Sequence, residues 1–169
     1  MLHRAWTAAL LLLPAAPLPR PAPLPTTIFI VRHAEKATDD PRDPSLTEAG
    51  RRRAVELARV LQDARITALF ATEFKRTRET LAPLAEAIGT KPVPLAAADL
   101  TGLVQGLQAL PPGSRAVVAS HSNLIHQIVA RLTGTELVQL TEADYDRLFV
   151  VTVTATGIGS VVVLRFGER

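Results

Sequence analysis

Cysteine is absent from the 169 residues, and aromatic side chains make up only 4% of them. The lack of cysteine excludes disulfide bridges and thiolate metal sites. The four histidines are scattered, and no two of them have the helical spacing of a metal-binding pair such as H-E-x-x-H. We therefore expect no metal centre in this protein.

A strong excess of either charge is also missing. The formal net charge is +3, and residues 1–25 contribute Arg4 and Arg20 but no acid, so the remainder carries +1. Such a balance is not typical of a nucleic-acid-binding domain. The densest basic cluster, Arg51-Arg52-Arg53, shares a predicted helix with acidic residues, which indicates a solvated helix face.

The first 25 residues have the composition of a targeting segment. A basic start precedes the apolar run from Thr7 to Leu13, which is too short to span a bilayer, and six prolines follow. This order matches a secretory signal peptide with an extended spacer, although a disordered extension is the alternative. We expect residues 1–25 to be this segment, residues 26–169 to be one domain, and the protein to be secreted or periplasmic without a stable membrane anchor.

Apolar runs and helical stripes alternate through residues 26–169. Thr47 is the expected start of the first helix, and Gly89 and Gly134 are expected helix ends. Two prolines restrict residues 91–95 to an edge strand or an extended segment. Buried strands are expected at 27–31, 66–71 and 116–120, with a terminal hairpin at 148–155 and 158–166. The pattern predicts an α/β fold, a three-layer α/β/α sandwich with a mostly parallel central sheet and a C-terminal antiparallel hairpin.

Polar residues follow two of the predicted strands where each strand ends. Arg32 and His33 follow the first, and His121 and Ser122 follow the last parallel one. An open α/β sheet binds its ligands beyond the carboxyl ends of its strands, so these residues should meet. A guanidinium group beside an imidazole suits a phosphate, because the first binds its oxygens and the second can attack phosphorus. For Arg32 and His33 alone, two surface residues after a strand are the simpler interpretation.

Four segments together resemble the histidine phosphatase superfamily, the phosphoglycerate-mutase-like enzymes. Residues 31–35 (VRHAE) are similar to its Arg-His-Gly motif, with Ala34 in place of glycine. Residues 43–50 (DPSLTEAG) resemble its Leu-Thr-x-x-Gly signature, and residues 71–80 (ATEFKRTRET) resemble its Ser-Ser-Pro-x-x-Arg-x-x-x-Thr segment. Residues 118–122 (VASHS) resemble its second histidine motif. The order and spacing carry the resemblance, and Ala34 is the form of the short SixA-like branch.

The resemblance implies a phosphatase that needs neither a metal nor a cofactor and hydrolyses phosphomonoesters through a phosphohistidine on His33. Arg32, Arg76 and His121 would surround the phosphoryl group, and Ser122 would add a further contact to the substrate. This set suits the chemistry, because phosphoryl transfer needs positioning and electrostatic stabilisation more than covalent assistance. The implied partner is a phosphorylated small molecule or a phosphoprotein, bound by a monomer.

The general acid for the leaving group stays open at this stage. Asp99 is a candidate, but it could equally be the N-cap of a helix that begins at Leu100; Glu35 is a local alternative. Two other functions also fit: a SixA-like phosphohistidine protein phosphatase, and a non-catalytic anion-binding domain on the same fold. Helices and strands take up nearly all of residues 77–120, so we expect no lid subdomain and an open site.

Overall fold

The computed structural model describes residues 22–157 and 159–167, so most of the expected signal segment at 1–25 lies outside the described residues. Within the described ranges, no helix is long and apolar enough to cross a bilayer. The elements follow in the order β1 (Thr26–Arg32), α1 (Glu48–Leu61), β2 (Ala68–Thr72), α2 (Lys75–Ile88), β3 (Val93–Leu95), α3 (Leu100–Gln108), β4 (Arg115–Ser120), α4 (Ser122–Thr133), β5 (Arg147–Val153) and β6 (Gly159–Arg165).

The six strands form one sheet in the order β3-β2-β4-β1-β5-β6. The first four of these are parallel, and β5 is antiparallel to both β1 and β6. The mostly parallel sheet with a C-terminal antiparallel hairpin is therefore confirmed. The proline-containing β3 lies at the edge, as expected for a strand that lacks a backbone donor. Strand β2 begins at Ala68, two residues later than predicted.

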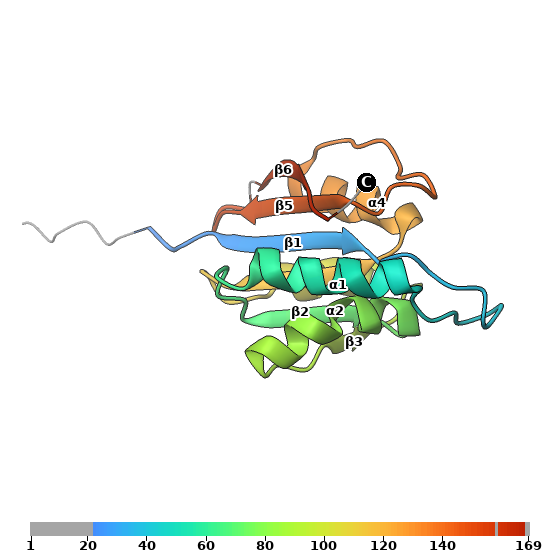
Figure 1. The fold of residues 1–169 in the computed structure, drawn as a ribbon. Coiled ribbons are helices and arrows are strands. Elements are labelled where there is room, and N and C mark those ends of the chain that lie inside the picture. Colours follow the sequence, from blue (N-terminus) through green and yellow to red (C-terminus); the bar gives the residue numbers. More distant parts are fainter. Residues whose placement is uncertain (1–21, 158, 168–169) are drawn as a thin grey trace, which may run out of the picture.

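Two apolar layers hold helices against the two faces of the sheet, which confirms the three-layer sandwich (Figure 1). Helices α1 and α2 cover one face, where Leu57 and Leu81 pack against β1, β2 and β4. Helices α3 and α4 cover the other face, where Leu107 and Ile128 pack against Ile30. All five of these side chains are at most 1% exposed. Because both faces are buried, the central residues of β1 (28–31) and of β4 (116–119) are all apolar.

The helix ends are mostly those that the sequence predicts. Thr47 caps α1 by accepting a hydrogen bond from the Gly50 N–H, and Gly89 and Gly134 close α2 and α4 in the left-handed conformation. Helix α4 begins differently, because neither Ser122 nor Asn123 caps it. Both lie inside the helix, and the N-cap position is His121, whose side chain makes no capping bond. The His121 ring is therefore available for other contacts.

Helix α1 packs unusually closely on the loop that follows β1. A Cβ atom at Gly50 would lie 2.4 Å from the carbonyl oxygen of Glu35, which leaves room for glycine alone. The same carbonyl accepts a hydrogen bond of 2.8 Å from the Thr47 N–H. The glycine of the Leu-Thr-x-x-Gly segment thus has a packing function: it fixes the backbone two residues beyond His33.

Candidate active site

The two strand-end histidines lie together at the carboxyl edge of the sheet. Strands β1 and β4 are adjacent and parallel, with Arg32 opposite Ser120, so the next residue of each chain segment is a histidine. The ring centroids of His33 and His121 are 5.4 Å apart, and the residues are only 4% and 7% exposed. The expectation that the two strand ends bring these imidazoles together is thus met in the structure.

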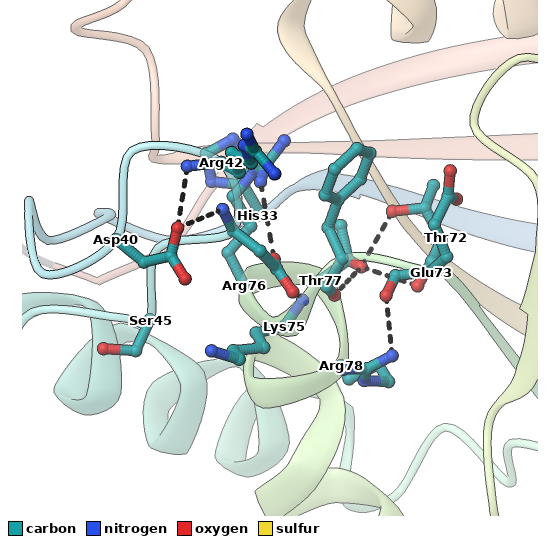
Figure 2. A network of polar contacts seen from close by, with 12 residues as sticks. His33, Asp40, Arg42, Ser45, Thr72, Glu73, Lys75, Arg76, Thr77 and Arg78 are labelled. Carbon is teal, nitrogen blue, oxygen red and sulfur yellow. Dashed lines mark hydrogen bonds and ion pairs between the residues drawn. The ribbon is translucent and has the colours of Figure 1, made fainter.

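Arg76 reaches the same place from the first turn of α2. Its Nη2 lies 3.5 Å from Nδ1 of His121, and its guanidinium stacks on the Phe74 ring at 4.2 Å. Asp43, in the loop after β1, is 3.9 Å from Nη1 and also accepts a bond from the backbone of α2. Figure 2 shows His33 and Arg76 near one another, next to the loop that carries Asp40. The Nε of Arg76 is buried without a partner among the described residues, so it keeps a donor for a ligand.

Arg32 is only 2% exposed, because a loop that the sequence did not single out covers it. Its Nη1 donates to the Thr141 carbonyl at 2.7 Å, and its Nη2 donates to Glu142 at 2.9 Å and to the Tyr145 hydroxyl at 3.3 Å. The guanidinium also lies 4.1 Å from the Tyr145 ring centroid.

The α4–β5 loop therefore changes the expected shape of the site. Helices α2 and α3 and strands β3 and β4 use most of residues 77–120, as predicted. Residues 134–146, which have no helical or strand periodicity, instead cover the Arg32 side of the site. The site is consequently less open than the length argument suggested, and Tyr145, 6.2 Å from the His33 ring, forms part of it.

The His33 ring is held in one tautomer by its own backbone. Nδ1 lies 2.8 Å from the Ala34 carbonyl, which can only accept, so Nδ1 carries the proton and Nε2 keeps its lone pair. Ala34 itself is fully buried, and its N–H donates to the Thr80 hydroxyl at 2.9 Å. Arg65 is the only non-glycine residue with positive φ in the described chain, so alanine fits at position 34.

Burial and nearby cations keep both imidazoles neutral. Burial, assisted by the charges of Arg32, His121 and Arg76, lowers the pKa of His33 to about 3. Burial and the charge of Arg76 lower the pKa of His121 to about 4. A neutral imidazole is the nucleophilic form, so His33 retains its lone pair well below neutral pH.

We expect these shifts to make the fold less stable in acid. The unfolded chain binds protons at its histidines as the pH falls through about 6.5, whereas folded His33 and His121 do so only near 3 and 4. Their contribution is therefore complete above pH 6.5 and is lost as the pH falls from there towards 4. Each group can contribute up to about 1.4 kcal/mol per pH unit to this decline.

Urea denaturation at pH 7.5, 6 and 5 measures this decline, and the variant His33→Gln should show a shallower dependence because one titrating group is gone. An unfolding free energy in the native protein that does not change between pH 7.5 and 5 would contradict the expectation.

Three other predicted residues lie in different settings. Asp99 caps α3, with Oδ1 accepting from the Gly102 N–H at 2.8 Å, so the capping interpretation is confirmed and no described contact links it to the histidines. Glu35 forms a two-pronged ion pair with Arg53, as close as 2.7 Å, which occupies its carboxylate. Ser122 lines a pocket of about 400 Å³ beside His121, together with Phe74, Arg76, Ala97, Ala98, Asn123 and Leu124.

Comparison with known proteins agrees with this geometry. The sequence profile of the histidine phosphatase superfamily (branch 1) matches residues 28–100, which contain His33 and Arg76. The protein histidine phosphatase SixA, solved with tungstate, shares 22% identity at a TM-score of 0.67, covering 82% of this chain and 96% of that one.

More distant solved structures share the fold as well. A mycobacterial glucosyl-3-phosphoglycerate phosphatase has 14% identity and a TM-score of 0.62, covering 83% of this chain and 99% of that chain. A phosphoglycerate mutase from Plasmodium falciparum has 18% identity and a TM-score of 0.60, covering 85% and 91%. No protein of curated function matches the sequence. Residues 28–100 thus match the histidine phosphatase superfamily, and the chain shares its fold with the SixA structure.

Proposed function

We propose that the protein is a phosphatase that hydrolyses phosphomonoesters outside the cytoplasm through a phosphohistidine intermediate on His33. The observation that carries this proposal is the buried, neutral His33 ring. Its Nδ1 is bonded to a carbonyl, and its Nε2 keeps a lone pair in a cluster with Arg32, Arg76 and His121. An anion-binding site alone would have no need of an imidazole held in its nucleophilic form.

The reaction takes place in two displacements at phosphorus. Nε2 of His33 bonds to phosphorus while the ester P–O bond breaks, and the leaving oxygen takes up a proton from water. Water then bonds to phosphorus while the P–N bond breaks, which releases phosphate and restores His33. The guanidinium groups of Arg32 and Arg76 stabilise the charge on the equatorial oxygens in both steps.

The phosphoryl group must replace a carboxylate that already occupies Arg32. In the free protein Glu142 lies on this guanidinium at 2.9 Å, and its side chain is 72% exposed. Because the Glu142 carboxylate is largely exposed to water, it can leave the guanidinium and be replaced by a phosphoryl oxygen at little cost. The tungstate bound to the similar SixA protein supports an oxyanion site in this fold.

The substrate class rests on two observations. Apart from Arg76 and His121, which belong to the cluster, the pocket beside His121 has only Ser122 and Asn123 as polar members. It therefore provides little to distinguish one leaving group from another. The signal-like residues 1–25 favour substrates outside the cytoplasm, such as sugar phosphates of the cell envelope. A phosphohistidine protein is the second candidate, supported by the similarity to SixA.

We expect similar kcat/KM values for an aryl phosphate and for several sugar phosphates, with slower turnover of a phosphohistidine-bearing protein. The measurement uses residues 26–169 and release of inorganic phosphate. Preference for the phosphoprotein by several orders of magnitude would establish the second candidate instead. A protein that binds phosphate but hydrolyses none of these compounds would be an anion-binding domain.

A further inference from the structure

Two buried threonine hydroxyls lie behind His121 and have no part in the chemistry described so far. Thr72, the last residue of β2, has its Oγ 3.0 Å from Nε2 of His121. Thr77, in the first turn of α2, has its Oγ 2.9 Å from the same Thr72 hydroxyl (Figure 2). Thr72 and Thr77 are 2% and 0% exposed, so their hydrogen bonds are made inside the protein.

The number of hydrogens available fixes which group donates in each hydrogen bond of this network. The Thr77 hydroxyl lies 2.8 Å from the Phe74 carbonyl and 3.1 Å from the Thr72 carbonyl, and a carbonyl oxygen can only accept. Its one hydrogen is thereby used, so it accepts from the Thr72 hydroxyl. The one hydrogen of Thr72 is then used in turn, and Thr72 must accept from His121. The bond therefore runs from Nε2–H of His121 to Thr72.

The other side of the ring agrees with this direction. Nδ1 of His121 faces Nη2 of Arg76 at 3.5 Å, and a guanidinium group can only donate. A proton on Nδ1 would point at another N–H group, whereas a lone pair there is attracted to it. Both neighbours of the ring thus favour the same tautomer, which is the opposite of the one that His33 adopts.

We propose that Thr72 and Thr77 are positioning residues that hold His121 as the Nε2–H tautomer, so that the lone pair of Nδ1 is presented to the site as a proton acceptor. This inference rests on the proposed phosphatase function. In the second displacement, the oxygen of water bonds to phosphorus while the bond from phosphorus to His33 breaks, and the proton of that water passes to Nδ1 of His121. The imidazolium keeps its Nε2–H bond to Thr72, and it loses the new proton to solvent after phosphate leaves.

Replacing the Thr72 hydroxyl by a methyl group removes the acceptor that holds the proton on Nε2 of His121. In Thr72→Val, Nδ1 can carry the proton for part of the time, and such a ring donates to a phosphoryl oxygen but cannot accept from water. We therefore expect kcat to fall by about 10- to 100-fold, with KM unchanged or lower. Thr72→Ser restores the hydroxyl and should restore kcat. The matched control is Thr26→Val. Thr26 lies at the start of β1, at the end remote from His33, and its buried hydroxyl also donates to a carbonyl.

Nitrogen NMR of the histidine rings tests the tautomer independently of turnover. In the native protein at pH 7.5, Nδ1 of His121 should have the shift of an unprotonated ring nitrogen, and Nε2 that of a protonated one. In Thr72→Val the two shifts should move towards each other, and in Thr72→Ser they should return.

A protonated Nδ1 in the native protein, or a Thr72→Val enzyme as fast as Thr26→Val, would overturn the inference. If no phosphate ester is hydrolysed, the proposed function fails; the NMR pattern still decides whether the two threonines set the tautomer.

Discussion

His33→Ala is expected to abolish turnover and to prevent formation of a phosphoenzyme. In the native protein, rapid quenching with a labelled phosphate ester should trap a phosphoryl group that is stable in alkali and labile in acid, as expected for a phosphohistidine. His33 is the residue whose Nε2 keeps a lone pair, since Nδ1 is bonded to the Ala34 carbonyl. Loss of a covalent nucleophile leaves only the binding groups, so the fall in kcat should be at least about 1000-fold.

The matched control is His126→Ala, which removes the imidazole of α4 that makes no described contact with the cluster. It should form the phosphoenzyme and turn over like the native protein. A label that appears on a residue other than His33, or a His33→Ala enzyme with native activity, would refute the covalent mechanism. Chelators are expected to have no effect on either protein, because the two displacements use only side chains of this chain.

Arg76→Ala is expected to lower kcat/KM by about 100-fold or more, which is the usual effect of removing a main electrostatic stabiliser. The guanidinium lies between Nδ1 of His121 and the carboxylate of Asp43, and its buried Nε has no partner in the described structure. A lysine at this position should restore only part of the activity, because an ammonium group cannot form the same paired donors.

Arg78→Ala provides the control for this prediction, since it removes the same charge two residues later in α2. Its guanidinium donates to the backbone carbonyl of Glu73 rather than to the cluster. Arg78→Ala should retain kcat/KM within about 2-fold, because it loses only a partly exposed contact. Equal losses in the two variants would mean that general positive charge, and not the position of Arg76, supports the reaction.

The two histidines of the cluster could be predicted because each follows a strand. His33 and His121 each come directly after an apolar run that only a buried strand explains, and adjacent parallel strands deliver their next residues to one edge. Arg76 was identified by its motif, since it enters from the first turn of a helix. The threonines at 72 and 77 were visible in the same segment, but only the structure reveals that their hydroxyls bond to one another and to His121.

Long-range polar contacts made from irregular segments could not be predicted. Glu142 and Tyr145 lie in a loop without periodicity, about 110 residues from the Arg32 that they contact. Arg53 was expected on a solvated helix face together with Arg51 and Arg52. Those two are exposed, but the Arg53 side chain is only 10% exposed, because it is bound by Glu35 in the loop that follows β1. The hydrophobic pattern of a sequence does not reveal such ion pairs, because they depend on which residues distant in the sequence come together in the fold.

The course of β1 has a practical consequence for work with this protein. The strand enters the sheet at Thr26 and delivers His33 at its far end, and seven extended residues span about 20 Å. A purification tag or an immobilising linker fused ahead of Thr26 is thus attached at the end of the sheet remote from the reacting atoms (Figure 1). The amino terminus is therefore the appropriate point of attachment to a resin or sensor surface, with the edge that carries His33 facing the solution.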